Sequence, residues 1–175
     1  GQPSPGVQAQ RFDEDNNPVT QENVPGEIRV KGDNVFLEYW ANEKATKESF
    51  HDGWFCTGDV AVLDNGYYRI MGRSSIDIIK SGGYKLSALE IEGTLLTHDD
   101  IAECAVIGVD DETWGESVMA FIGLKAGKSM EHGDLKAWCD GKMSSYKIPK
   151  AIQIIDALPR NAMGKVTKPD LKKLL

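Results

Sequence analysis

The sequence is poor in cysteine, and the few cysteines present do not form a motif. Cys56, Cys104 and Cys139 are far apart and show no Cys-x-x-Cys spacing. An odd and scattered set of this kind predicts neither a disulfide framework nor a zinc site, so we expect no metal-binding residues. Reduced thiols in an intracellular compartment are the expected state.

Positive charge and long hydrophobic runs are also scarce. Asp and Glu number 27 against 20 Lys and Arg, which gives a formal net charge of −7. This balance argues against a nucleic-acid-binding surface, and no basic block or basic amphipathic helix is present to bind a membrane surface. No run is long enough to span a bilayer, and no signal peptide opens the chain. The mitochondrial matrix and the cytoplasm both stay open as compartments.

Residues 1–72 have the pattern of an antiparallel, β-rich segment. Asp64-Asn65-Gly66 separates two apolar runs at 59–63 and 67–71, and Asn-Gly in such a position is a strong hairpin signal. Residues 42–50 are polar and predict one or two helical turns. Further strands are expected at residues 7–12, 27–31 and 35–40. The segment is too short and too rich in loops to be a comfortable independent domain.

Residues 73–175 predict a small α+β domain that contains a three-stranded sheet with helices. Ser87-Ala88-Leu89-Glu90 has the pattern of a capping box, which begins a helix over 87–97. The expected strands are 102–109, 117–124 and 151–155, of which the first is almost continuously apolar, as in a strand covered on both faces. Two more helices are expected, one at 131–143 and one that begins at Thr167. The candidate buried residues of these helices are Leu89, Leu95, Leu96, Leu135, Trp138, Cys139 and Met143.

Two charged residues, one in the first segment and one at the start of the second, are candidate nucleotide ligands. Asp59 follows the flexible Gly58 at the entry to the predicted hairpin, and a carboxylate there can accept two hydrogen bonds from a ribose diol. Arg73 follows Gly72 and has a guanidinium fork suited to a ribose or a phosphate. The ordinary alternatives are an aspartate that closes a turn and an arginine in a surface salt bridge.

Two glycine-containing stretches in the second segment are the other candidates. Gly82-Gly83 permits positive φ and a close approach of the backbone to a ligand, although an ordinary tight turn uses the same residues. Residues 158–165 form a loop that presents Lys165, a mobile point charge suited to stabilising a growing negative charge. This loop is not a Walker A motif, because Pro159 replaces the first glycine and Val166 replaces the Ser or Thr. Its alternative is one more solvated lysine.

These candidate residues lie in three stretches of the chain. In combination and in this order, the three stretches resemble the late core motifs of the adenylate-forming superfamily. This superfamily comprises acyl-CoA synthetases, peptide-synthetase adenylation domains and beetle luciferases. The matching stretches are residues 54–59, 72–92 and 159–165, and the resemblance covers essentially the whole chain. Residues 80–92 and 158–165 look closest to the malonyl-CoA synthetases of plants and animals, the latter including acyl-CoA synthetase family member 3.

The resemblance implies a two-step reaction that uses ATP, Mg²⁺ and CoA. Malonate, or a similar small carboxylic acid, would attack ATP to give an acyl-adenylate, and the CoA thiol would then displace AMP. Lys165 would be the catalytic lysine of the first step, and Asp59 and Arg73 would bind the ribose end of the nucleotide. Between the steps the second domain would turn about a hinge, and Gly82, Gly83, Tyr84 and Lys85 would then meet CoA.

The resemblance also implies that residues 1–72 are the end of a large N-terminal AMP-binding domain and that residues 73–175 are its C-terminal lid domain. The phosphate-binding loop, the adenine site and the acyl pocket would then precede residue 1. The partner of this chain would be that N-terminal domain. By itself, the chain is expected to bind nucleotide weakly and to catalyse nothing.

Two departures from the family pattern stand out. Cys56 occupies a position where the family usually has Arg or Lys, which changes the local charge but leaves Asp59 in place. The stretch from Arg73 to Gly83 is one residue longer than the commonest spacing. Counting from either end therefore assigns the hinge to Ser75 or to Ile76, and the sequence does not decide between the two.

Two alternatives to a malonyl-CoA synthetase stay open. The enzyme could act on another small or medium acyl group, because the N-terminal domain sets acyl selectivity in this family. The chain could instead be an interaction module that has the lid fold without catalysis. The presence of Asp59, Arg73 and Lys165 together argues against the module, since a binding module does not need all three.

Overall fold

The computed structural model describes residues 1–175 and divides the chain into two compact units. The units are Gly1–Ser75 and Ile76–Leu175. The break between them follows Ser75, whereas the sequence placed the domain boundary after residue 72. None of the helices is long and apolar enough to cross a membrane.

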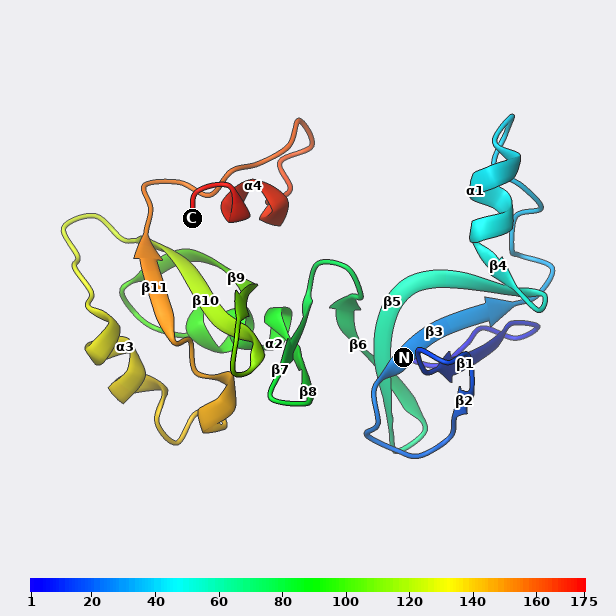
Figure 1. The fold of residues 1–175 in the computed structure, drawn as a ribbon, viewed down its shortest axis with the longest axis horizontal. Coiled ribbons are helices and arrows are strands. Elements are labelled where there is room, and N and C mark those ends of the chain that lie inside the picture. Colours follow the sequence, from blue (N-terminus) through cyan, green and yellow to red (C-terminus); the bar gives the residue numbers. More distant parts are fainter. The chain divides into compact units, whose positions relative to one another are not determined.

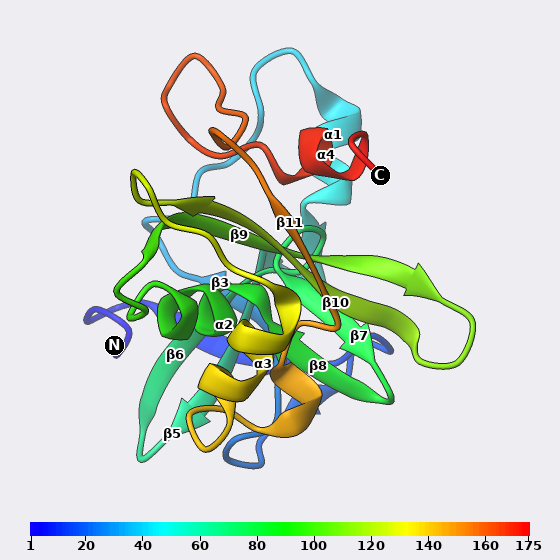
Figure 2. The same ribbon diagram turned by 90° about the vertical axis from the view of Figure 1, so that its left-hand side faces the viewer.

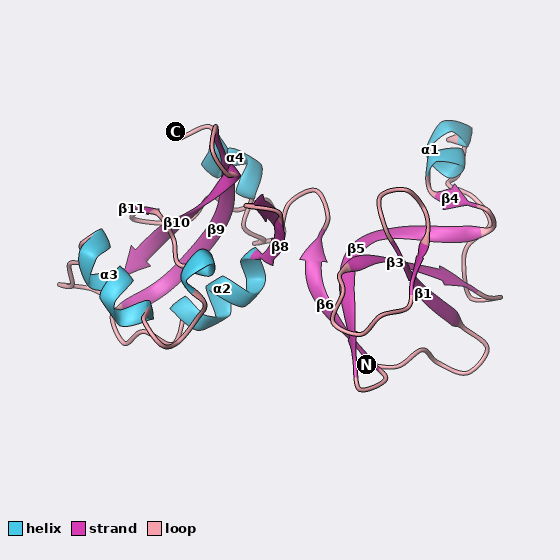
Figure 3. Cartoon of the chain, turned by 60° about the horizontal axis from the view of Figure 1, so that its bottom comes forward, coloured by secondary structure: helices cyan, strands magenta, loops and turns pink.

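The first unit is built on a six-stranded antiparallel sheet with the order β2-β1-β3-β5-β4, in which β6 also pairs with β5 (Figure 1). Its strands are β1 (Gln8–Phe12), β2 (Pro18–Val19), β3 (Gly26–Lys31), β4 (Phe50–His51), β5 (Trp54–Asp64) and β6 (Tyr67–Arg73). Helix α1 (Glu43–Glu48) is short and begins where Asn42 Oδ1 accepts a hydrogen bond from the Ala45 N–H. Figure 3 shows the strands and this helix by secondary structure. The predicted β-rich character and the helical turns at 42–50 are confirmed.

The predicted hairpin between β5 and β6 is present. Asp64 pairs with Tyr67, so Asn65 and Gly66 form a two-residue turn, and both have positive φ, at 48° and 78°. This backbone conformation matches the twist of the two strands and explains the Asn-Gly sequence.

The strand predicted at residues 35–40 is wrong, because this segment is a loop. The Val35 N–H bonds back to the Gly32 carbonyl, which turns the chain away from the sheet. Phe36 then packs against the rings of Tyr39, Phe50 and Phe55. Local aromatic packing therefore accounts for Phe36 and Tyr39, whereas Leu37 and Trp40 are almost fully exposed.

The second unit contains a five-stranded sheet, so the predicted three strands are a correct but incomplete set. The three are β9 (Ile101–Asp111), β10 (Gly115–Leu124) and β11 (Ala151–Ile154), with β9 antiparallel and β11 parallel to β10. The additional strands are β7 (Ile78–Ser81) and β8 (Tyr84–Ser87), which form a hairpin around Gly82 and Gly83. This hairpin was not predicted because its strands are only four residues long.

The sheet of the second unit is covered on both faces. Helices α2 (Ala88–Leu95) and α3 (His132–Cys139) pack on one face, and α4 (Lys168–Lys172) packs on the other, as Figure 2 shows. A 3₁₀ turn (Ser145–Lys147) precedes β11. Strand β9 alternates between the two cores: Cys104 and Val106 belong to the first, and Ala105 and Ile107 to the second. This confirms the prediction of a strand covered on both faces.

Helix α2 begins as predicted, but two of its three predicted buried leucines are exposed. Ser87 Oγ accepts a hydrogen bond from the Glu90 N–H at 3.1 Å, which caps the first turn. Leu95 is buried, whereas Leu89 and Leu96 are 45% and 48% exposed. The buried stripe instead runs through Ala88, Ile91 and Leu95, which follow helical spacing.

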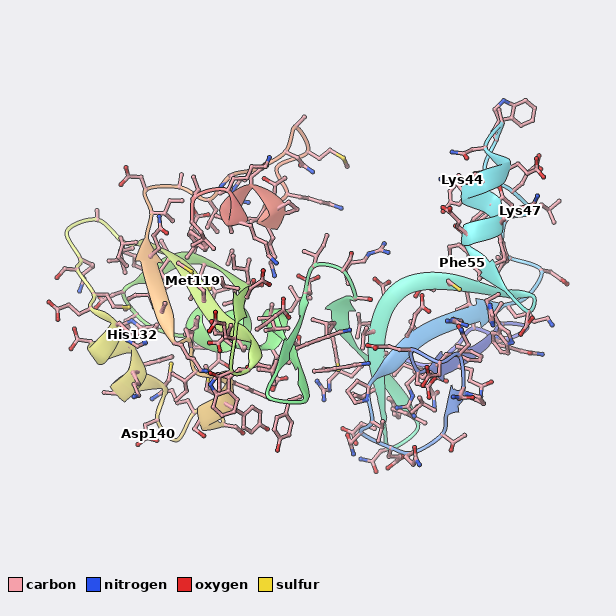
Figure 4. The ribbon with its side chains drawn as sticks, viewed as in Figure 1. Lys44, Lys47, Phe55, Met119, His132 and Asp140 are labelled. Atoms are coloured by element: carbon pink, nitrogen blue, oxygen red, sulfur yellow. The ribbon has the colours of Figure 1, made fainter.

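Helix α3 follows its prediction more closely, and α4 begins at the predicted position. Leu135 and Cys139 are buried, while Trp138 and Met143 are partly buried against the same core. Thr167 is the N-cap residue of α4, and Leu171 lies in the core on the opposite face. Met119, labelled in Figure 4, lies on this α4 side of β10.

Candidate functional site

Asp59 and Arg73 are brought together by the β5–β6 hairpin. They are direct partners in its register, and Arg73 Nε lies 3.0 Å from Asp59 Oδ1. The Asp59 side chain is 34% exposed and that of Arg73 is 58% exposed. Sequence reasoning selected both residues as ribose ligands but did not predict that they pair. Both polar groups thus lie at an accessible edge of the first unit, where a ligand can reach them.

Gly58 shapes the backbone beside this ion pair. Its φ is 74°, and a Cβ atom at this position would lie 3.0 Å from Arg73 Nη1. The same nitrogen donates a hydrogen bond to the Thr57 carbonyl at 2.6 Å. Glycine is therefore favoured here by the positive φ, and a side chain would also require the Arg73 guanidinium to shift slightly.

The predicted hinge residues, Ser75 and Ile76, lie at the break between the compact units. Both are exposed and lie in a turn. On the side of the first unit, the Ser74 N–H donates to the Gly58 carbonyl at 2.9 Å. On the side of the second unit, the Asp77 carbonyl accepts from the Ala88 N–H at 2.8 Å. The two candidate hinge residues thus stand between hydrogen-bonded positions of the two units.

Asp77 belongs to a buried group of charges that sequence reasoning missed. Lys168 Nζ lies 2.7 Å from Asp77 Oδ1 and 2.8 Å from Glu92 Oε1, and the lysine side chain is 10% exposed. The same Glu92 oxygen also accepts the Val106 N–H of β9 at 2.7 Å. A sequence signal existed, because Glu92 follows Ala88 by one helical turn and so lies beside the apolar stripe of α2. This charged group ties the residue next to the break to α2, α4 and β9.

The four residues predicted to meet CoA lie in and after the β7–β8 turn. Gly82 and Gly83 have φ values of 57° and 82°. The Gly82 N–H donates to the Trp114 carbonyl, and a Cβ atom on Gly82 would lie 2.9 Å from the Trp114 ring. Tyr84 is 57% exposed and stacks on Tyr146, with ring centroids 4.8 Å apart. Lys85 is half-buried and pairs in register with Lys80.

Lys165 is exposed at the end of a closed loop between β11 and α4. Asn161 closes the loop: its Oδ1 accepts the Met163 and Lys165 N–H groups, both at 3.0 Å, and its own N–H donates to the Lys165 carbonyl. Gly164 has a φ of 78°, which lets the chain turn back toward Asn161. Hydrogen bonds thus hold the backbone of Lys165, while its side chain is exposed.

The thiols do not form a reactive or metal-binding centre. Burial raises the pKa of Cys104 to about 12 and raises the pKa of Cys56 and of Cys139 as well. The three thiols are therefore neutral at physiological pH and are weak nucleophiles. No group of three or more His, Cys, Asp or Glu residues is arranged to hold a metal ion.

Known protein families and sequences similar to this chain identify its family. Residues 90–165 match the AMP-binding enzyme C-terminal domain. The chain is 51% identical over 155 residues to the mitochondrial malonate–CoA ligase ACSF3 of Mus musculus, which covers 88% of the chain and 27% of that relative. It is 48% identical over 187 residues to the malonate–CoA ligase of Arabidopsis thaliana, which covers 100% of the chain and 30% of that relative.

Solved structures give the same result for the fold. ATP-bound MatB from Rhodopseudomonas palustris superposes with a TM-score of 0.86 at 36% identity, over 99% of this chain and 35% of that protein. The o-succinylbenzoate CoA synthetase of Bacillus subtilis gives a TM-score of 0.87, also at 36% identity, over 98% of this chain and 35% of that protein. The chain thus spans less than a third of the length of the two malonate–CoA ligases. It belongs to the adenylate-forming superfamily, and its residues 90–165 are the AMP-binding enzyme C-terminal domain.

Proposed function

We propose that this chain is the C-terminal part of an AMP-forming acid–thiol ligase that makes malonyl-CoA from malonate, ATP and CoA. The observation that carries the proposal is the 51% identity, over 88% of the chain, to a relative named as a malonate–CoA ligase. That relative is also named as mitochondrial, and we propose the mitochondrial matrix or the cytoplasm as the compartment of this protein.

In the first half-reaction, a malonate oxygen attacks the α-phosphorus of ATP, malonyl-adenylate forms and pyrophosphate leaves. The Lys165 ammonium group would lie against the carboxylate and α-phosphate oxygens and would offset the negative charge of the transition state. Its place in the Asn161-closed loop supports this role, because the loop fixes the lysine backbone and leaves the ammonium group exposed. The lysine acts by position and charge and is not itself modified.

Asp59 and Arg73 would hold the ribose end of the nucleotide. The Asp59 carboxylate can accept hydrogen bonds from two ribose hydroxyl groups while Arg73 stays beside it at 3.0 Å. Mg²⁺ would accompany ATP, but this chain has no cluster of ligating side chains for it. We propose that its site lies mostly in the large N-terminal domain, which is the proposed partner of this chain.

In the second half-reaction, the CoA thiol attacks the acyl carbonyl and AMP leaves. The C-terminal unit would first turn about Ser75 and Ile76, which withdraws Lys165 and brings residues 82–85 to the CoA thiol arm. The position of these two residues at the break between the units supports such a pivot. A hinge of this kind needs only a few residues that absorb the change in φ and ψ.

A second candidate is a CoA ligase for a different acid. The chain is 43% identical to the 2-succinylbenzoate–CoA ligase of Geobacillus kaustophilus, over 86% of the chain. Thioester formation by the full-length enzyme with a panel of carboxylic acids decides between the two candidates. Malonate should be used best if the first proposal is correct, and an aromatic or longer acid should be used best if the second is correct.

Lys165→Ala in the full-length enzyme is the direct test of the mechanism. We expect adenylate formation to fall by about 100-fold or more, because one group that stabilises transition-state charge is removed. Thioester formation from supplied malonyl-adenylate should keep the wild-type rate. Lys172→Ala, at an exposed lysine of α4, is the matched control and should leave both steps unchanged. Equal losses in the two half-reactions would contradict the role of Lys165.

A further inference from the structure

Glu103 on β9 makes two hydrogen bonds to the loop that carries Lys165. Its Oε1 accepts the Leu158 N–H at 2.9 Å, and its Oε2 lies 2.6 Å from Arg160 Nη2. The hydrogen bond from the Leu158 N–H lowers the pKa of the Glu103 carboxyl group most, and the Arg160 guanidinium lowers it further. This side chain is therefore charged at neutral pH.

The contacts continue from Arg160 to the residue before the lysine. Arg160 Nη1 donates to the Gly164 carbonyl at 2.9 Å, and a β-bridge joins Arg160 to Val166. Leu158 is buried in the core on the α4 side of the sheet, together with Phe121 and Leu171. Figure 1 shows the loop in orange, leading from β11 to α4. Glu103 therefore holds both the start of the loop and, through Arg160, its end.

The sheet provides room for the Glu103 side chain. Gly123 of β10 is its direct partner in the register, and a Cβ atom on Gly123 would lie 2.8 Å from Glu103 Cγ. Any other residue at 123 would displace the glutamate or be displaced by it. The glycine and the glutamate thus form a matched pair that directs the carboxylate toward the loop.

We propose that Glu103 is a positioning residue for adenylate formation, acting through the Leu158 N–H and the Arg160 guanidinium on the loop that presents Lys165. The inference rests on the proposed function. The Glu103 carboxylate fixes the position of the Lys165 backbone relative to the sheet. The Lys165 ammonium group therefore extends toward the reacting oxygens from a fixed backbone position. Glu103 itself touches neither malonate nor nucleotide.

The test compares the two half-reactions of the full-length enzyme that carries Glu103→Gln. We expect malonyl-adenylate formation to slow by about tenfold to 100-fold, because small misplacements of a reacting group have effects of this size. Thioester formation from supplied malonyl-adenylate should keep the wild-type rate. Asp100→Asn is the matched control: its carboxylate also makes an ion pair at 2.6 Å, with Lys128, but lies outside the loop, and neither half-reaction should change.

Two further variants separate positioning from general damage. Glu103→Gln and Arg160→Ala should each slow adenylate formation, and the loss in the double variant should be smaller than the two single losses combined, because the two side chains share the Glu103–Arg160 contact. Gly123→Ala alone should also slow adenylate formation, because the added Cβ atom would displace the Glu103 side chain. In an enzyme that already carries Glu103→Ala, Gly123→Ala should cause no further loss. Additive losses, or equal losses in both half-reactions, would overturn the inference.

The wild-type enzyme separates this inference from the proposed function. If it forms malonyl-adenylate and Glu103→Gln does so at the same rate, the inference alone is overturned. If the wild-type enzyme forms no acyl-adenylate from any acid tested, the proposed function fails first.

Discussion

Two groups of paired charges stand on either side of the break at Ser75–Ile76, and they differ in exposure. Before the break, Asp59 and Arg73 pair at 3.0 Å with side chains that are 34% and 58% exposed. After the break, Lys168 lies between Asp77 and Glu92, and the three side chains are only 10% to 13% exposed. Carboxylates and cations that look alike in the sequence are therefore placed in very different environments.

The difference in exposure separates a binding function from a structural one. An exposed ion pair contributes little to stability, so its members can exchange partners with a ligand at small cost. Removing one member of a buried set is expensive, because the charges that remain have been taken out of water. The first group therefore suits a nucleotide site, and the second suits a fixed joint between the start of the second unit and α4.

The largest expected effect is on stability, in Lys168→Met. Removing the ammonium group leaves two buried carboxylates close together, and breaking a buried ion pair costs about 3–5 kcal/mol. Chemical denaturation monitored by circular dichroism measures this change. Arg73→Met is the matched variant in the exposed pair, and its cost should not exceed about 1 kcal/mol. Similar losses in the two variants would contradict the proposed division of roles.

Asp59→Asn should affect ligand binding and leave stability nearly unchanged. The amide keeps the size of the side chain but removes the charge that would strengthen its bonds to the ribose hydroxyls. Hydrogen bonds to charged groups contribute about 1.5–3 kcal/mol, so AMP affinity in the full-length enzyme should fall about 10-fold to 100-fold. Calorimetric titration measures the affinity. Wild-type affinity in the variant would remove Asp59 from the nucleotide site.

Proline substitution can identify which of Ser75 and Ile76 is the pivot. Proline fixes its own φ and also restricts the residue before it. If the pivot is Ser75, both Ser75→Pro and Ile76→Pro should slow the step that follows rotation. If the pivot is Ile76, Ile76→Pro should slow it much more than Ser75→Pro.

The expected cost of a forbidden backbone conformation is about 1–3 kcal/mol, which corresponds to a fivefold to 100-fold loss in thioester formation. Rates from supplied malonyl-adenylate report this step, and the rate of adenylate formation serves as the internal control. Wild-type thioester rates in both variants would show that neither residue is the pivot.

The sequence predicted those parts of the fold that local rules determine. The Asn65-Gly66 turn, the Ser87 cap and the doubly buried strand β9 each depend on a few neighbouring residues, and all three are present. The loop at 35–40 was taken for a strand because aromatic packing within a loop produces the same apolar run. The β7–β8 hairpin was overlooked because a four-residue strand carries too little pattern to be recognised.

The sequence could identify single residues of the candidate site, but not the contacts that support them. Asp59, Arg73 and Lys165 could be selected from their motifs, because each stands beside glycines at a recognisable spacing. Their supporting contacts join residues that are far apart in the chain: Lys168 and Asp77 are 91 positions apart, and Glu103 and Arg160 are 57 apart. No local rule connects such pairs, so these contacts become visible only when the sheet is assembled.

The hydrogen bond from the Val106 N–H to Glu92 has a consequence for solubility. Strand β9 pairs only with β10, so its other side is an edge whose backbone groups could recruit a strand from another molecule. The Glu92 carboxylate occupies one of these N–H groups and places a charged helix side chain along that edge. One of the buried charges at the joint thus occupies a backbone donor that an incoming strand would need for pairing.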